Sequence, residues 1–471
     1  MLRRLLAASA AVAVMASAQR GVPSDWQAAM NRVRVESIRA HLSFLASDLL
    51  EGRATPSRGL DIAAEYIASQ FRRAGLEPMI GDGFYQPLDL REAAVDFGGV
   101  ECTVFDSGHE TSVSGVPVST DGIDVVREPM LPATESSIAA KGAVIVFRGE
   151  PGDRPRDQLR QLGGLDAKVV IVVDPTGRFA RAATRIAAVP SDKTPKIPAG
   201  RFLFVADFPA HPAPDARVTV RAKPTAVRTL SARNVVGLFR GSDPVLRDTY
   251  VVVSAHYDHE GMRPFGSGDR IFNGANDNAS GVTGMLEMAL SFAALPERPK
   301  RSIIFAAFAG EEDGMLGSHE FVKHAPVPLD RIVADINFEH LGRPDADGTT
   351  YIGKGTITGF DFSTIGTTLT AAARTMGVEL LKHEKFSDPF FKASDNLSFA
   401  EVGIPAHTVS NGFIFAEYHA VGDEWPKINA ENMTGLVRAL MLGVLTIADD
   451  AKAPQWNEAN EKTLEYRQRA K

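Results

Sequence analysis

The sequence predicts an α/β protein in which a central mixed, mostly parallel sheet is flanked by helices and a smaller β-rich module is inserted. Two patterns lead to this prediction. From Asn234 onward, apolar strand-like runs alternate with amphipathic helix-like runs, an order typical of a sheet covered on both faces. Between about Val95 and Ala226, short β-branched runs separated by Pro, Gly and Asp are typical of a compact β-rich unit.

The elements follow from the spacing of apolar residues. Residues 37–76 show helical spacing on both sides of the Gly52-Arg53 turn, which predicts two helices. After the insert, the expected strands are 250–255, 302–309, 332–338 and 404–409, and the expected helices are 281–294, 364–376 and 430–448. The chain then divides into a signal (1–18), an N-terminal part of the main domain (19–94), the insert (95–226), the main domain (227–449) and a polar, loosely held tail (450–471).

The composition excludes several classes of protein. The 471 residues include 51 Lys and Arg against 58 Asp and Glu, and 44% of them are hydrophobic. That apolar content argues against general disorder. The net charge of -7 argues against a nucleic-acid binder, which needs clustered basic residues to neutralise phosphates. Cys102 is the single cysteine, so no internal disulfide can form.

Residues 1–18 have the form of a secretory signal. Two arginines precede an apolar run from Leu5 to Ala16, and the small residues at 16 and 18 suit cleavage. This run is shorter than the roughly 20 residues that cross a bilayer. The later apolar run 436–448 is interrupted by Arg438. We therefore expect a periplasmic or secreted protein without a membrane span.

Polar clusters directly follow the expected strands, where chemistry collects in α/β folds. The first strand ends in His256 and is followed by Asp258. Residues two apart in an extended segment face the same side, so this carboxylate can orient the imidazole. The other clusters contain Asp277 in the turn 273–281, Glu311 and Glu312 in 310–314, Glu339 in 337–343, and His419.

Taken alone, each cluster has an ordinary explanation. A single strand-end histidine or carboxylate is most often a loop residue, and adjacent acids are usually a solvated face. We leave His109, His211, His324, His383 and His407 in this ordinary class. Several histidines and carboxylates that each follow a strand can, however, converge on one sheet edge, and nitrogen and oxygen ligands without thiolate suit zinc or a related divalent ion. A serine-hydrolase elbow and a phosphate-binding P-loop are both absent from the sequence.

Together these motifs resemble those of the two-zinc aminopeptidases of metallopeptidase family 28, which also holds glutamate carboxypeptidases and glutaminyl cyclases. The resemblance covers 234–449 and the N-terminal segments 41–48 and 51–53. It implies the zinc-exopeptidase type of fold. The insert resembles a protease-associated domain through the segments 141–146 and 167–173.

The resemblance implies a role for each residue. His256 would bind one zinc, Glu312 and His419 the other, and Asp277 would bridge the two. Asp258 would orient His256, and Glu311 would be the general base and acid. Glu339 stands where the family usually has Asp, so its extra methylene moves this ligand of the first metal, and His340 is an outside candidate for the position. Co²⁺ or Mn²⁺ are alternatives to zinc.

The function implied is that of an exported aminopeptidase acting on peptide or protein N-termini. Carboxypeptidase action, glutaminyl cyclisation and a non-catalytic binding protein on the same fold are the alternatives. We expect no nucleic-acid partner, and the oligomeric state is left open. Phe390, Phe391, Phe413 and Phe415 are either pocket lining or ordinary core.

Overall fold

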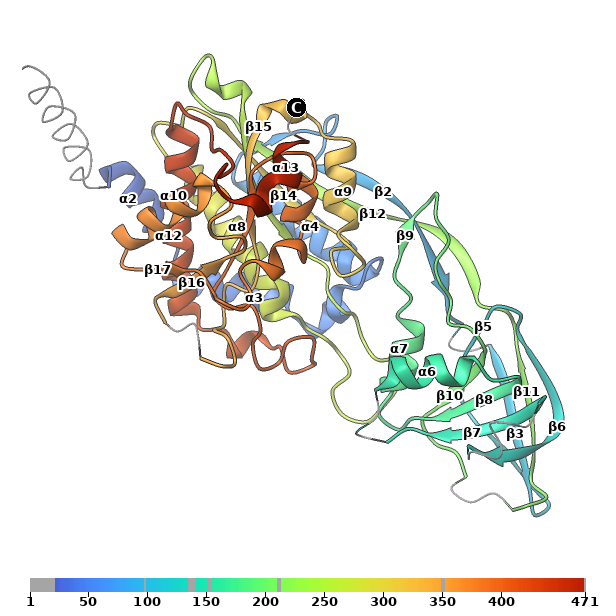
Figure 1. The fold of residues 1–471 in the computed structure, drawn as a ribbon. Helices are drawn as coiled ribbons and strands as arrows, with labels where there is room; N and C mark the ends of the chain where they lie inside the picture. The colour runs from blue at the N-terminus through green and yellow to red at the C-terminus, as the bar shows by residue number, and fades with distance from the viewer. Residues whose placement is uncertain are drawn as a thin grey trace, which may run out of the picture.

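The computed structural model describes residues 22–96, 99–133, 141–150, 152, 154–209, 213–348 and 352–469. The expected signal, residues 1–18, lies outside the described residues. Figure 1 shows a larger α/β lobe and a smaller lobe that projects from one side of it. A ten-stranded sheet forms the larger lobe and an eight-stranded sheet forms the smaller one.

The sheet of the larger lobe is mixed. Its strands, in spatial order, are β17 (Glu379–Leu381), β16 (Lys354–Ile357), β18 (Ala406–Ser410), β15 (Ile332–Phe338), β13 (Tyr250–His256), β14 (Ser302–Phe308), β12 (Ala226–Phe239), β2 (Tyr85–Ala94) and β9 (Val189–Pro190), and β1 (Glu77–Pro78) pairs with β12. The central strands β18, β15, β13 and β14 pair in parallel. Strands β12, β2 and β9 on one side and β16 on the other join antiparallel. The parallel centre is the part that carries the predicted site.

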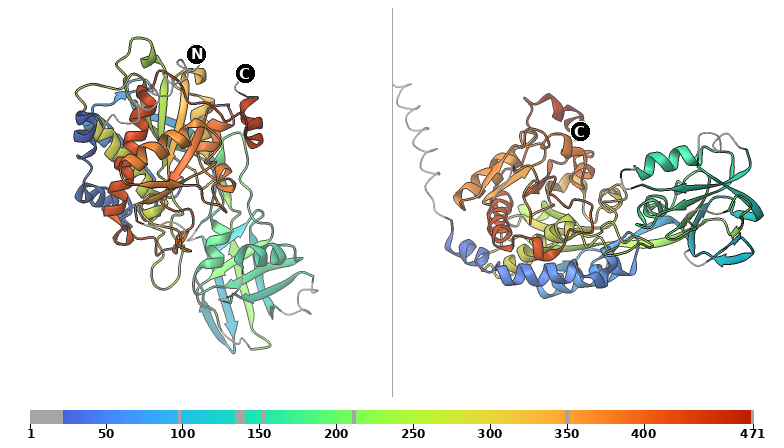
Figure 2. Two further views of the ribbon diagram at one scale, coloured as in Figure 1. Left: turned by 60° about the vertical axis from the view of Figure 1, so that its left-hand side comes forward. Right: turned by 90° about the horizontal axis from the view of Figure 1, so that it is seen from below.

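Helices cover both faces of this sheet (Figures 1 and 2). They are α2 (Ser24–Met30), α3 (Val35–Leu45), α4 (Arg58–Arg73), α8 (Ser280–Phe292), α9 (Leu316–Lys323), α10 (Thr364–Thr375), α11 (Asn396–Ala400) and α12 (Ala430–Asp449). One apolar core joins α3, α4, α8, α10 and α12 to one face, and a second core packs α9 and α11 on the other. In α8 every residue except Leu290 is buried, so this central helix is covered by neighbouring elements on nearly all sides.

The predicted strands correspond closely to β13, β14 and β15. The strand expected from Ile404 begins later, at Ala406, because Pro405 has no N–H to donate to the sheet. Helix α12 is by length and composition the one described helix able to cross a membrane, but 78% of its most apolar window is buried inside the protein. It therefore packs as a core helix of the larger lobe.

The smaller lobe is built from the chain between β2 and β12. Its strands, in spatial order, are β4 (His109–Ser112), β3 (Val100–Asp106), β11 (Arg217–Ala222), β6 (Ile123–Pro132), β7 (Ala143–Arg148), β8 (Ala167–Val173), β10 (Arg201–Val205) and β5 (Gly115–Ser119). Two helices, α6 (Pro155–Gly163) and α7 (Arg178–Thr184), lie on the side toward the larger lobe (Figure 1). The likeness of this insert to a protease-associated domain stays a prediction.

The expectation of a loosely held tail is wrong. Trp456 and Tyr466 are 9% and 2% exposed and pack with Phe391 in a small aromatic core. The indole N–H of Trp456 also donates to the carbonyl of Gly403 at 2.8 Å. The few aromatic residues hold this segment against the protein in spite of its polar composition, because each buries a large apolar area. Short helices η8 (Glu461–Thr463) and α13 (Leu464–Arg467) complete the tail.

Candidate metal centre

Loops at the carboxyl ends of the parallel strands bring the five predicted ligands together. His256 is the last residue of β13, and Glu339 directly follows β15. Glu312 lies in the turn after β14, and His419 lies in the loop after β18. Asp277 lies in the segment η4 (Ala275–Ala279), immediately before α8. This edge is where sites form in α/β sheets.

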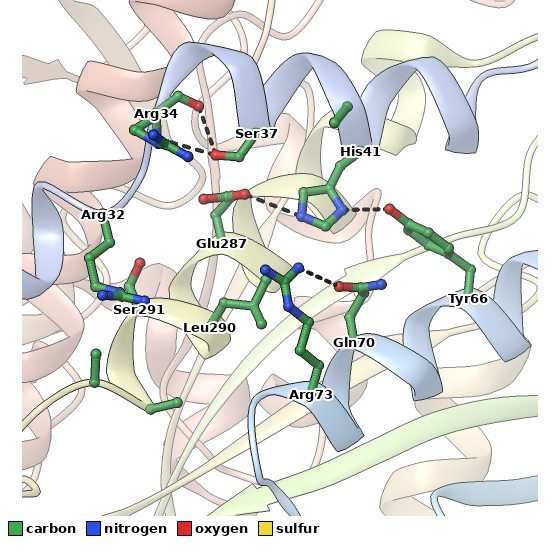
Figure 3. A pocket seen from close by; sticks show the side chains of 13 residues that line it. Arg32, Arg34, Ser37, His41, Tyr66, Gln70, Arg73, Glu287, Leu290 and Ser291 are labelled. Carbon is green, nitrogen blue, oxygen red and sulfur yellow. Dashed lines mark hydrogen bonds and ion pairs between the residues drawn. The ribbon is translucent and has the colours of Figure 1, made fainter.

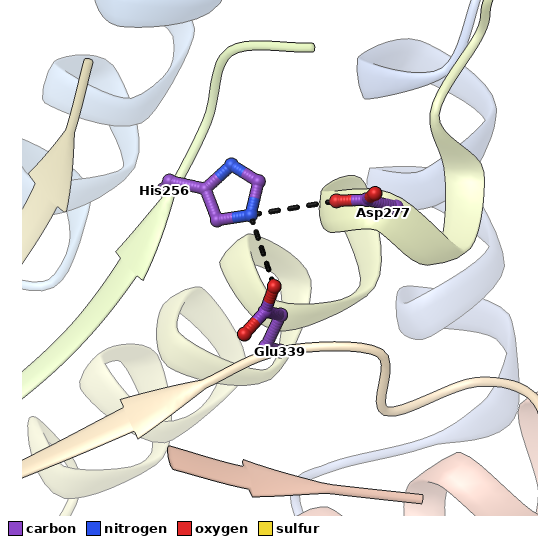
Figure 4. A group of neighbouring side chains, drawn as sticks. All are labelled: His256, Asp277 and Glu339. Atoms are coloured by element: carbon purple, nitrogen blue, oxygen red, sulfur yellow. Dashed lines mark ion pairs between the residues drawn. The ribbon is translucent and has the colours of Figure 1, made fainter. Parts of the chain in front are cut away.

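The first group of ligands is His256, Asp277 and Glu339 (Figure 4). Nε2 of His256 lies 3.4 Å from Oδ1 of Asp277 and 3.7 Å from Oε1 of Glu339. The carboxylate of Glu339 thus reaches the group in spite of its extra methylene. His340 is also present: its Nε2 lies 3.5 Å from the same Asp277 oxygen.

Asp277 and Glu312 form the second group with His259, and His419 faces the same two carboxylates from the loop after β18. Nε2 of His419 lies 3.2 Å from Oδ2 of Asp277 and 3.5 Å from Oε2 of Glu312. Asp277 therefore turns one carboxylate oxygen toward each group. A carboxylate in this position can bridge two cations.

Two further carboxylates surround His256 without belonging to these groups. Oδ1 of Asp258 lies 3.7 Å from Nδ1 of His256, on the side of the ring away from Asp277, and accepts a hydrogen bond from the backbone N–H of Glu311. Oε2 of Glu311 lies 4.0 Å from Nε2 of His256. Burial raises the pKa of Glu311 well above its usual range; His256 opposes this shift and the negative charge of Glu339 adds to it. Such a shift toward neutrality suits a group that accepts and returns a proton.

The electrostatics of the centre fit a divalent cation. Within the described part of the chain, both ring nitrogens of His256 and of His340 are buried without a hydrogen-bond partner. Burial alone would raise the pKa of Asp277, but positive charge at His340 and His259 outweighs it and holds the pKa well below its usual range. Unpartnered imidazole nitrogens facing ionised carboxylates form the donor set that zinc prefers.

Buried hydrogen bonds fix the loops that carry the ligands. The carboxylate of Asp423 accepts hydrogen bonds from the backbone N–H groups of Asn276 and Asp277, each at 3.0 Å. Nδ2 of Asn278 donates to the carbonyl of Phe338 at 2.9 Å, which ties the Asp277 segment to the end of β15. These hydrogen bonds fix the segment that carries the Asp277 carboxylate.

Arg53 holds the same loops from the N-terminal side. Its guanidinium is 1% exposed and donates to the carbonyls of Tyr257, Asn273 and Gly274 at 2.8, 2.7 and 3.0 Å, and also to that of Leu45. The adjacent Gly52 has a φ of 69°, and a Cβ there would lie 2.2 Å from the carbonyl oxygen of Gly261. The predicted Gly52-Arg53 turn is therefore a support of the site.

Residues 234–442 match the sequence profile of peptidase family M28. This part of the chain is a peptidase family M28 domain. A probable zinc metalloprotease of Pyrenophora teres f. teres is 40% identical over 119 residues, which cover 25% of this chain and 24% of the relative. The probable lipoprotein aminopeptidase LpqL of Mycobacterium tuberculosis is 25% identical over 340 residues, covering 69% of this chain and 62% of the relative. The chain thus spans less than two thirds of the length of these relatives.

The fold as a whole also has solved counterparts. The zinc aminopeptidase BSAP from Bacillus subtilis matches with a TM-score of 0.57 at 19% identity, covering 89% of this chain and 96% of that structure. At this identity the match establishes the shared fold. It extends beyond the M28 domain to most of the chain.

Several residues beside the M28 centre were not predicted. His259 is 1% exposed, and its Nδ1 lies 2.8 Å from Oε1 of Glu312. Glu260 lies beyond it and pairs with two arginines of the insert, Arg181 and Arg185, the latter at 2.9 Å. Nη2 of Arg185 also lies 3.7 Å from Oε2 of Glu312. Two features of the sequence could have identified these residues. One is an arginine at every third or fourth position of 178–185, and the other is a second histidine after β13.

A larger cavity, of about 620 Å³, lies away from the M28 centre between α3, α4 and α8 (Figure 3). His41 and Glu287 meet in it at 3.2 Å, and Nδ1 of His41 lies 2.9 Å from the hydroxyl of Tyr66. One histidine and one carboxylate do not make a metal site of the kind found at the strand ends. We therefore place the chemistry at the strand ends in spite of the size of this cavity.

Of the histidines left in the ordinary class, His383 and His407 are buried, and His383 lies in a separate group with Asp345 and Asp347. His407 is fully buried; its Nδ1 lies 2.7 Å from the carbonyl oxygen of Thr358 and its Nε2 lies 2.6 Å from the hydroxyl of Ser363. Phe391 belongs to the aromatic core under the tail. Phe415, by contrast, lies beside the centre, with its ring centroid 5.3 Å from that of His340.

Proposed function

We propose that the chain is an exported aminopeptidase with two zinc ions in its M28 centre. The observation that carries the proposal is the orientation of Asp277, whose Oδ1 faces His256 and whose Oδ2 faces His419. With Glu339 and Glu312 this would give each ion its own carboxylate and one carboxylate in common, with His256 on the first ion and His419 on the second.

The residues divide between holding the metals and moving protons. His256, Asp277 and Glu339 would hold one zinc, and Asp277, Glu312 and His419 the other. When bound, the pair of ions polarises the scissile carbonyl and lowers the pKa of water. Asp258 would fix the ring of His256 through Nδ1, and His259 would fix Glu312 through its contact at 2.8 Å.

Glu311 would be the general base and acid. It takes the proton of the attacking water and returns it to the leaving amine. Its carboxylate is 4.0 Å from Nε2 of His256, so it borders the first ligand group without belonging to it. Removing a base in this role costs roughly 100- to 10,000-fold in rate.

Aminopeptidase action is favoured by the names of several relatives. Besides LpqL, the aminopeptidase YwaD of Bacillus subtilis is 34% identical over 113 residues. Export is supported by the arginine pair, apolar run and small residues of 1–18. The protein would then act in the periplasm or outside the cell on the N-termini of peptides.

The test compares the mature, zinc-loaded protein with its Glu311→Gln variant on leucine p-nitroanilide. We expect hydrolysis by the wild type and a loss of at least about 100-fold in the variant with its zinc content unchanged. Glu384→Gln, which removes an exposed carboxylate, is the matched control and should retain full activity.

Other outcomes distinguish the alternatives. Removal of C-terminal residues from N-acetylated peptides would identify a carboxypeptidase. Cyclisation of an N-terminal glutamine would identify a cyclase. Two bound zinc ions with no turnover of any of these substrates would indicate a binding protein.

A further inference from the structure

The insert contributes arginines to the wall of the metal centre. Arg178 and Arg181 belong to α7, and Arg185 follows it, a spacing that places the three on one side of the helix. Arg181 and Arg185 are both tied to Glu260, which itself lies 3.6 Å from Nδ1 of His419. Helix α7 is thereby held against the loop that supplies one of the zinc ligands.

Next to this contact a cavity of about 490 Å³ opens between the two lobes. Its lining comes from the start of α6, from α7 and from two loops of the M28 domain. The charged groups that line it are all arginines: Arg154, Arg156, Arg178, Arg181 and Arg263. His419 is also in the lining, so the cavity and the metal centre share a wall.

The arginines are fixed in place more firmly than surface side chains usually are. The guanidinium carbons of Arg181 and Arg263 lie 4.0 and 5.6 Å from the ring centroid of Phe272, which is 3% exposed. Stacking on this buried ring restricts the motion of these two guanidinium groups.

The cavity carries more positive charge than its neighbours neutralise. Glu260 forms an ion pair with Arg181, but within the described residues neither Arg156 nor Arg263 forms an ion pair with a carboxylate. This excess of cations is local, because the whole chain has a net charge of -7. A cluster of oriented guanidinium groups next to a catalytic centre is a receptor for an anionic ligand.

We propose that this arginine cavity binds a carboxylate of the substrate peptide and so makes the enzyme selective for acidic peptides. The inference rests on the proposed function, because it takes the ligand to be a peptide whose N-terminus lies at the zinc ions. The insert then acts as a selectivity element. The carboxylate has two sources, the peptide's own C-terminus and an Asp or Glu side chain near the scissile bond, and both present the same planar group to arginine.

The test measures binding by calorimetry, so that it does not depend on turnover. Zinc-loaded, full-length mature protein carrying Glu311→Gln is titrated with Leu-Gly-Gly, its C-terminal amide, Leu-Glu-Gly amide and Leu-Gln-Gly amide. The first pair isolates the C-terminal carboxylate and the second isolates the side chain. We expect at least one carboxylate form to bind about 10-fold or more tightly than its neutral partner, and the preference to shrink at high salt.

The preference should disappear in the Arg156→Gln, Arg263→Gln double variant, while binding of the neutral amides stays unchanged. Arg160→Gln is the matched control, since Arg160 lies on α6 with its side chain 82% exposed and outside the cavity lining. It should keep the full preference.

Equal binding of the carboxylate and neutral forms, or a preference that survives in the double variant, would overturn the inference. Failure of the proposed function would be recognised separately, as absence of leucine p-nitroanilide hydrolysis by the wild-type protein. If the carboxylate preference is found in the parent protein and lost in the double variant, the cavity assignment is supported whether or not the wild-type protein hydrolyses leucine p-nitroanilide.

Discussion

Oδ2 of Asp277 lies 3.2 Å from Nε2 of His419, while the other oxygen of the same carboxylate faces His256. His256 ends β13 and His419 lies in the loop after β18, and both face this one carboxylate. Asp277 is therefore the shared member of two neighbouring ligand groups.

The two histidines near Glu312 should differ in their importance for zinc. His419→Ala removes a ligand, so we expect about one zinc per chain in place of two. His259→Ala removes a hydrogen-bonding neighbour of Glu312, which should weaken zinc binding by roughly 10- to 100-fold without abolishing it. Zinc titration of the chelator-treated variants measures both effects. A complete loss of one zinc in His259→Ala with retention in His419→Ala would reverse the assignment.

Arg53 should be required for the stability of the larger lobe. Arg53→Lys replaces a planar fork that reaches four buried carbonyls by an ammonium with three donors. Carbonyls left without a donor should lower the free energy of unfolding by roughly 2 to 4 kcal/mol. Thermal unfolding checks this, with the exposed Arg58→Lys as control. Equal melting temperatures in the two variants would show that the carbonyls are satisfied in another way.

His407 should make the protein sensitive to acid. Burial lowers the pKa of His407 to about 4 from 6.5, although its bond to the Thr358 carbonyl opposes the shift. The unfolded chain takes up this proton near pH 6.5 and the folded chain does not, so stability is lost as the pH falls from 6.5 to 4. The loss amounts to about 3 kcal/mol.

His407→Gln tests this, because the variant lacks the titrating group and keeps all others. Its melting temperature should be lower than that of the wild type at pH 7, and the gap should narrow toward pH 4. Parallel profiles for the two proteins would contradict the assignment.

The sequence predicts that three of the proposed ligands lie close together because each comes at or just after the end of a strand with a clear apolar pattern. Once β13, β14 and β15 are placed side by side in parallel, their ends must meet, and His256, Glu312 and Glu339 meet with them. The role proposed for Asp258 follows from its spacing to His256, and that proposed for Glu311 follows from the resemblance to family 28.

The remaining parts of the site depend on contacts that local patterns do not encode. Arg185 comes from the insert, and nothing in its neighbourhood in the sequence shows that α7 is held against Glu260. His259 turns toward Glu312 only because the chain leaves the strand at His256. The packing of Trp456 under Gly403 is likewise a long-range contact.

The zinc content of the mature protein tests the central claim most directly. After purification in the presence of zinc and removal of free metal, elemental analysis should give two zinc ions per wild-type chain. Asp277→Asn should give clearly fewer than one, because both groups lose their common carboxylate, whereas Asp269→Asn, an exposed change in the same loop, should keep two. One zinc per wild-type chain, or two in Asp277→Asn, would contradict a centre bridged by Asp277.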